Sequence, residues 1–283
     1  MRIYLLSCMM RFALVVTCCV ATSAAFAVDL PAHFVYRGTL TAFPDDKQDR
    51  GQEIKQFQID AFVEESAENE LVMNYVISEN GSGGWHWSQQ YGTLTYNRAQ
   101  QAQSGREWML LNAYDEAEYE VAFRSPWFEK LDQLSAGATW EENPFVYTVN
   151  KDTNSDSEKS WSVNMKHNLS RHQDLQIEKE TGLITEARQT VFMGQGLKFQ
   201  LDWKLEKQLP LDSETWAAVS KVWETLATLQ KELKVDLYVP VEELNSDQLS
   251  LARAQIDTLK TGAAGTPFES LVRRIELQTE LGE

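Results

Sequence analysis

Cysteine is almost missing from this 283-residue sequence, which holds three, Cys8, Cys18 and Cys19, all close to the N-terminus. Beyond them the chain has no thiol nucleophile, no CxxC redox pair, no thiolate metal site and no disulfide framework. A lipid anchor on Cys18 or Cys19 is the rival interpretation, and it is disfavoured because Thr17, before Cys18, stands where a lipoprotein signal has Gly, Ala or Ser. The folded part must therefore be stabilised by its own apolar core.

Long apolar runs are missing too. The apolar stretch Phe12–Val20 falls far short of the roughly 20 residues that a membrane-spanning helix needs. Arg2 and Arg11 precede it, and Ala25-Phe26-Ala27 offers small residues where a signal peptidase cuts. We therefore expect residues 1–27 to be a signal peptide cleaved after Ala27, and the product to be periplasmic or secreted and not an integral membrane protein.

Positive charge is scarce. The chain has 26 Lys and Arg against 42 Asp and Glu, a formal net charge of −16. Residues 1–27 hold two basic and no acidic residues, so the remainder carries 24 − 42 = −18. Nucleic acids and anionic lipids are bound by surfaces rich in Lys and Arg. The composition therefore predicts an acidic protein with no nucleic-acid partner.

Sequence motifs of the common catalytic and metal classes are missing as well. There is no GxSxG, HExxH or P-loop, and the four histidines, His33, His86, His167 and His172, show no metal-ligand spacing. Asp152, Asn154, Asp156 and Glu158 resemble the start of a calcium loop, but Ser157 and Val163 replace the required Gly and Glu. We expect a solvated loop there, no metal and no cofactor. The catalytic residues of any activity stay unknown.

What the sequence does have is alternation of apolar and polar residues, repeated in short runs between about 33 and 208, as in Phe57, Ile59, Ala61 and Val63. This is the period of half-buried strands, and connections as short as Lys179–Gly182 require antiparallel pairing. About ten such strands exceed what a flat sheet holds easily. The predicted fold is α+β and mainly β, a curled antiparallel sheet or half-barrel formed by residues 28–210.

The period changes after Pro210 to that of helices. One apolar stripe runs from Trp216 to Leu233, a second helix follows Ser246, and Thr266-Pro267-Phe268-Glu269 forms a capping box that predicts a third. No Gly/Ser/Pro-rich linker separates them from the strands. We therefore expect residues 211–283 to be a helical segment packed on the sheet.

The most unusual local feature is the glycine-rich stretch before Trp85, His86 and Trp87. Two indoles around an imidazole form a candidate ligand platform, since exposed indoles stack on sugars and other flat apolar groups. The alternative is that one or both tryptophans fill the core. Of the other tryptophans, Trp108, Trp161 and Trp203 fall in strands, and Trp216 and Trp223 fall on the helix stripe.

The stretch Trp140–Glu206, with its Lys179-Glu180-Thr181-Gly182-Leu183 turn, resembles the late strands of LolA-like envelope carrier proteins. That resemblance implies a curled sheet that carries lipid. Gly83-Gly84-Trp85 and the segment Val191–Gly196 resemble the β-rich N-terminal region of exported redoxin-type proteins, here without the redoxin domain.

These observations favour a non-catalytic envelope protein that binds an apolar or aromatic-stacking ligand or a protein partner. The partner classes left open are a lipid, a glycan or another envelope protein. Two alternatives remain: a glycan hydrolase with a carboxylate pair near Trp85 and Trp87, and an accessory subunit of a thiol oxidoreductase.

Overall fold

The computed structural model describes residues 29–42, 52–80, 85–87, 91–100, 102–105, 109–112, 117–120, 126–151, 159–167, 172–193, 197–233, 245–269, 272, 273 and 276. The expected signal peptide, the calcium-like loop at 152–158 and Trp108 lie outside these ranges. The elements in chain order are β1 (Ala32–Ala42), β2 (Gln52–Ala67), β3 (Glu70–Asn80), β4 (Trp85–Trp87), β5 (Tyr91–Asn97), β6 (Ala102–Gly105), β7 (Met109–Asn112), β8 (Ala117–Glu120), β9 (Thr139–Glu142), β10 (Phe145–Val149), β11 (Ser160–His167), β12 (His172–Glu178), β13 (Ile184–Met193), β14 (Leu197–Pro210), α1 (Ser213–Leu233) and α2 (Ser246–Ala263).

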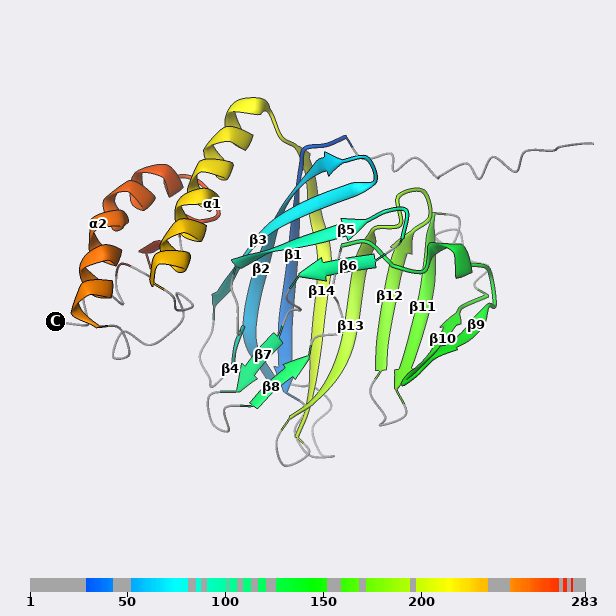
Figure 1. Ribbon diagram of the computed structural model, residues 1–283. Helices are drawn as coiled ribbons and strands as arrows, with labels where there is room; N and C mark the ends of the chain where they lie inside the picture. The colour runs from blue at the N-terminus through cyan, green and yellow to red at the C-terminus, as the bar shows by residue number, and fades with distance from the viewer. Residues whose placement is uncertain are drawn as a thin grey trace, which may run out of the picture.

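Eleven strands form one antiparallel sheet, in the order β6-β5-β3-β2-β1-β14-β13-β12-β11-β10-β9, and β4, β7 and β8 form a small second sheet. Two meanders, one from each half of the chain, meet where β1 pairs with β14 over nearly its whole length. Strands β6 and β9 lie at the two edges, so the sheet is open (Figure 1). The predicted mainly β, antiparallel fold with C-terminal helices is confirmed.

The large sheet has two differently covered faces. Its inner face carries the main apolar core, which includes Phe34, Tyr36, Ile59 and Trp203. The small sheet and the segment 126–138 lie against this face, in front of the strands in Figure 1. Trp127 anchors that segment by bridging to Leu183 and by stacking on Tyr96 at a centroid distance of 5.9 Å.

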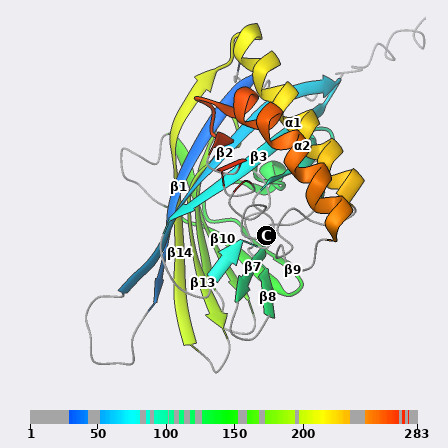
Figure 2. The same cartoon turned by 90° about the vertical axis from the view of Figure 1, so that its left-hand side faces the viewer.

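The C-terminal helices pack on the opposite, outer face of β2, β3 and β5. Phe62, Val76 and Tyr91 share a second apolar cluster with Val219, Val222 and Leu226 of α1 and with Leu259 and Ala263 of α2. Trp223 contacts Tyr91 edge-on at 5.6 Å, which joins the helix stripe to the sheet. Figure 2 shows both helices lying beside the sheet at this end.

Helix α2 begins with a capping box on Asn245, the residue before Ser246. Asn245 accepts hydrogen bonds from the backbone N–H groups of Asp247 and Gln248, and the Gln248 side chain accepts from Asn245 N at 2.9 Å. At the expected third helix, Thr266 Oγ1 accepts from Phe268 N at 3.3 Å, and Glu269 accepts from Gly265 N. The Glu269 contact is therefore one residue earlier than a capping box on Thr266 requires. Among the described residues, no helix has both the length and the hydropathy to cross a bilayer.

Candidate ligand-binding site on the inner face of the sheet

Buried polar side chains on the inner face gather at one level of the sheet. Lys55 of β2, Gln189 of β13 and Gln173 of β12 are all less than a tenth exposed. Each of the three faces the core, because it lies two residues along its strand from an inward apolar residue: Phe57, Val191 and Leu175, respectively. We call these three residues, with Glu79 of β3, the polar row.

The strand register places the polar row across the sheet. Direct cross-strand partners face the same side. Reading across from β2, the positions are Lys55, Leu40, Leu201, Gln189, Gln173, Met165, Tyr147 and Trp140. Glu79 lies one level away, opposite Phe57. A single level of the inner face thus runs from a buried charge at β2 to an aromatic pair at β9 and β10.

The two charges in the polar row neutralise each other. Lys55 Nζ donates to Glu79 Oε2 at 2.7 Å, and both side chains are almost fully buried. Because a buried ion survives only with a partner, this pair is held together inside the apolar face. The polar row therefore carries no net charge.

Gln173 differs from the other members of the polar row. It is 3% exposed, and neither its amide nitrogen nor its amide oxygen has a hydrogen-bond partner in the described part of the chain. A buried amide without partners costs about 1–3 kcal/mol for each group, which is why such groups are rare in folded proteins. Gln173 is thus a buried donor and acceptor pair on an apolar wall.

Aromatic side chains line the inner face at the β9–β10 end of the sheet, on the right in Figure 1, where they are only half-buried. Trp140, Phe145 and Tyr147 are half-buried there and pack against the main core, whereas most of the large inner residues of β1 to β3, such as Phe34, are buried. The rings of Trp140 and Tyr147 stack at 4.8 Å with an interplanar angle of 5°. We call these three residues the aromatic edge. Trp140 Nε1 is buried, and it too has no hydrogen-bond partner within the described ranges.

Two buried tyrosines, Tyr36 of β1 and Tyr96 of β5, also face the core, away from the aromatic edge. Burial raises the pKa of Tyr36 and, aided by the negative charge of Glu129, raises the pKa of Tyr96 to about 12. Both hydroxyls therefore stay protonated at neutral pH. The Tyr96 hydroxyl has no hydrogen-bond partner among the described residues, so it is an inward donor in addition to Gln173 and Trp140.

The Trp85–Trp87 stretch forms strand β4, which pairs with β7. Trp87 is 1% exposed, and its ring meets Phe57 edge-on at 5.1 Å, so this indole lies in the core. The side chains of Trp85 and His86 lie outside the described part of the structure. Their predicted role in ligand binding stays a prediction.

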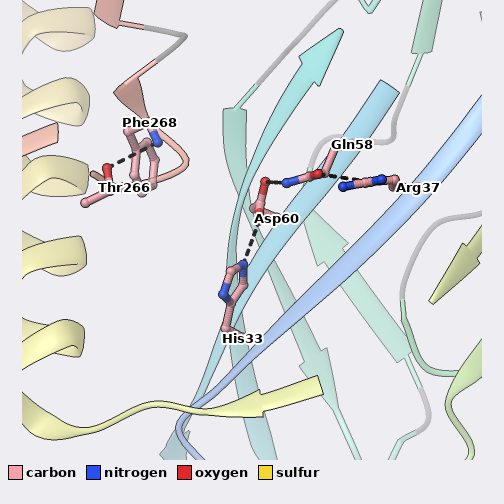
Figure 3. A network of polar contacts seen from close by, with 6 residues as sticks. All are labelled: His33, Arg37, Gln58, Asp60, Thr266 and Phe268. Carbon is pink, nitrogen blue, oxygen red and sulfur yellow. Dashed lines mark hydrogen bonds and ion pairs between the residues drawn. The ribbon is translucent and has the colours of Figure 1, made fainter. Parts of the chain in front are cut away.

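A separate polar network lies on the outer face, between the sheet and the helices (Figure 3). Asp60, which is 1% exposed, accepts from Gln58 Nε2 at 2.8 Å and lies 2.7 Å from His33 Nε2. The His33 ring stacks on Phe62 at 4.4 Å, and Phe62 stacks on Phe268 at 5.7 Å. Because both Asp60 carboxylate oxygens are engaged, this network stabilises the helix-covered end of β1 and β2.

The remaining histidines and acidic residues were considered as metal ligands. In the ranges that the structure describes, no group of three or more His, Cys, Asp or Glu side chains is placed to hold a metal ion. His167 meets Phe145 edge-on at 5.0 Å, and His172 is exposed at the start of β12. His167 and His172 therefore lie in different surroundings, one in an aromatic contact and the other in solvent.

The polar row was not predicted from the sequence, although each of its members is recognisable there as a polar residue at an inward position of a strand. Lys55, Glu79, Gln173 and Gln189 all interrupt the apolar phase of a strand. A polar residue in that phase predicts a buried polar group, because its neighbours at two-residue spacing face the core. The pairing of β1 with β14, which puts all four on one sheet, is not readable from local alternation.

The chain was compared with family models, curated proteins and solved structures. No family model matches the chain, and no curated protein does. Among solved structures, it is similar to a LolA superfamily protein from Nitrosomonas europaea, at 9% sequence identity and a TM-score of 0.20, over 67% of this chain and 91% of that one. This is the superfamily that the Trp140–Glu206 resemblance indicated. The fold class of the present chain is established by its own strand order and register.

Proposed function

We propose that this chain is a non-catalytic envelope protein that binds an apolar ligand against the inner face of its sheet, entering from the aromatic edge. The observation that carries the proposal is that apolar surface and buried polar atoms occur together at this end of the sheet. An aromatic, half-buried surface leads to a buried apolar wall, where Gln173 and Trp140 hold polar atoms that have no hydrogen-bond partner among the described residues. Ligand sites of this kind are mostly apolar with a few placed polar groups.

The charges of the chain agree with an uncharged or apolar ligand. Lys55, the buried cation of the inner face, is already neutralised by Glu79 at 2.7 Å. The glycan hydrolase alternative needs two carboxylates at the reaction centre. Of the buried carboxylates described, Glu79 contacts Lys55 and Asp60 contacts His33 and Gln58. These contacts give no support to an acid–base pair.

The test combines purification with a probe. The protein is expressed with its leader, its N-terminus is determined, and native mass spectra are compared with denatured ones for a co-purified apolar molecule. Binding of the uncharged fluorophore N-phenyl-1-naphthylamine is then titrated. Wild type is expected to bind it, and Tyr147→Ala to bind roughly tenfold or more weakly, since loss of a buried aromatic contact costs about 1.5–3 kcal/mol.

Val146→Ala is the matched control. Val146 is the neighbouring residue on β10, is 37% exposed and faces the other side of the sheet, so its loss should leave probe affinity unchanged. A wild-type protein that carries no molecule and binds no apolar probe contradicts the proposal. Turnover of a glycan that disappears with one carboxylate substitution would establish the alternative.

A further inference from the structure

We infer that Gln173, with Gln189 opposite it, forms a subsite for a neutral group that both donates and accepts a hydrogen bond, such as the secondary amide of an N-acyl chain. This rests on the proposed function, and it specifies the chemical class of the ligand. The ligand's apolar part lies along the inner face towards the aromatic edge.

The first step is the hydrogen-bonding capacity of Gln173. A glutamine amide offers two donor hydrogens and an acceptor oxygen. Both of its polar atoms are buried, and neither meets a partner in the described residues. A group that satisfies them must therefore supply an acceptor and a donor together. An alkane supplies neither, and an ester or ketone supplies only the acceptor.

The described residues around Gln173 carry no unbalanced charge. The register places Gln173 directly opposite Gln189 on one side and Met165 on the other. These neighbours carry no charge, and the inner-face ion pair of Lys55 and Glu79 is internally balanced. Among the described residues, a phosphate or carboxylate bound at Gln173 would find no buried cation that is not already paired, and an ammonium would find no unpaired buried carboxylate. The subsite therefore selects a neutral polar group.

The third step is where the chain of the ligand lies. Along the level of the polar row, Gln173 is followed by Met165, Tyr147 and Trp140 on the next three strands. Three strand spacings amount to roughly 14 Å, a length that an extended dodecyl chain covers. Met165 is buried, and Tyr147 and Trp140 are half-buried, so apolar contact surface continues from the amide to the open end.

The experiment uses a matched series of ligands and the same purified protein as the probe titration. N-methyldodecanamide supplies donor and acceptor, methyl dodecanoate supplies the acceptor only, tridecane supplies neither, and dodecyl phosphate is charged. Affinities are measured by displacement of N-phenyl-1-naphthylamine. We expect the amide to bind roughly tenfold more tightly than the ester or the alkane, the gain of about one or two matched hydrogen bonds, and the phosphate to bind weakest.

Two variants assign the preference to Gln173. Gln173→Leu should bind the amide about as weakly as wild type binds the alkane, with alkane affinity kept. Gln176→Leu is the control, since Gln176 lies three residues along β12 on the outer face. If Gln173→Leu does not fold, the test uses the wild-type protein instead, in which the side-chain ¹⁵N–¹H₂ resonances of Gln173 are followed by NMR during ligand titration. They are expected to shift with the amide and not with tridecane.

The outcomes separate the two proposals. Binding of all four ligands with equal affinity, or an amide preference that survives in Gln173→Leu, overturns the Gln173 subsite and leaves the apolar carrier standing. Resonances of Gln173 that do not respond to the amide overturn it as well. A protein that binds none of the ligands and no fluorophore overturns the carrier, and the subsite with it.

Discussion

At the scale of single residues, close packing makes Gly38 irreplaceable in the centre of the sheet. A Cβ atom at this position would lie 2.2 Å from Phe57 Cζ and 2.4 Å from the backbone oxygen of Asp202. Neither neighbour has room to move, because the Phe57 ring is held edge-on by Trp87 and Trp203. We expect Gly38→Ala to lower the free energy of unfolding by about 1–3 kcal/mol in urea titrations.

Gly262→Ala in α2 is the comparison for Gly38, since its nearest contact is Val222 Cγ2 at 3.2 Å. Alanine is also favoured over glycine inside a helix by about 1 kcal/mol, so this change should cost much less. Equal effects of the two substitutions would contradict the packing argument.

The buried pair of Lys55 and Glu79 gives a second prediction at this scale. Replacing Lys55 alone by Met leaves the Glu79 carboxylate, 7% exposed, without its 2.7 Å partner, and should cost about 3–5 kcal/mol of unfolding free energy. The double variant Lys55→Met with Glu79→Leu should recover most of that loss, because two apolar side chains suit the inner face. A double-mutant cycle in urea measures this, and strictly additive losses would show that the pair does not act as a unit.

The pKa of Tyr96 predicts an alkaline loss of stability. Burial raises the pKa of Tyr96 from 10.0 to about 12. Because the folded protein holds this proton more tightly, the stabilisation is complete below pH 10 and is lost as the pH rises towards 12. We expect wild type to lose about 2 kcal/mol across this window and Tyr96→Phe to lose less. Identical pH profiles of unfolding free energy for the two proteins would rule out this residue as a cause.

At the scale of elements, Phe268 packs the segment after α2 against both the sheet and helix α1. It is fully buried, stacks on Phe62 at 5.7 Å and meets Trp223 at 6.0 Å. Phe268→Ala should cost about 3–5 kcal/mol of unfolding free energy and should shift the Trp223 fluorescence to longer wavelength as water reaches this contact. Measurement in a Trp216→Phe background reduces the other helix signal, and an unchanged spectrum would contradict the packing role.

The longer strands could be predicted from the sequence, whereas the shortest strands and the strand order could not. Alternation identified most strands of the large sheet, since each set such as Phe57 to Val63 buries one side. The four-residue strand β9 and the three-residue strand β4 were missed, because so few residues hold no period. The order of strands depends on the long-range pairing of β1 with β14. The polar row follows from that pairing, and so no single segment predicts it.

At the scale of the whole molecule, the two ends of the sheet differ in how they are covered. At β2, β3 and β5, one face carries the main core and the other carries α1 and α2. At β9 and β10, the three aromatic residues of the inner face are half-buried, and Val146 on the outer face is exposed. Local opening follows low contact density. The β9–β10 end should therefore open first, with β2 and β3 closest to global unfolding.

Hydrogen–deuterium exchange measures this asymmetry and links it to binding. Amides of β9 and β10 should exchange well before those of β2 and β3 in the free protein. Adding N-methyldodecanamide should slow exchange in β9 to β12, where Trp140, Tyr147 and Gln173 lie, with no comparable change in α1 and α2. A ligand that binds the half-open end stabilises the closed form there, since binding shifts the opening equilibrium by mass action. Protection confined to the helices would place the ligand on the outer face and would contradict the inner-face site. Uniform protection would indicate global stabilisation without a local site at the aromatic edge.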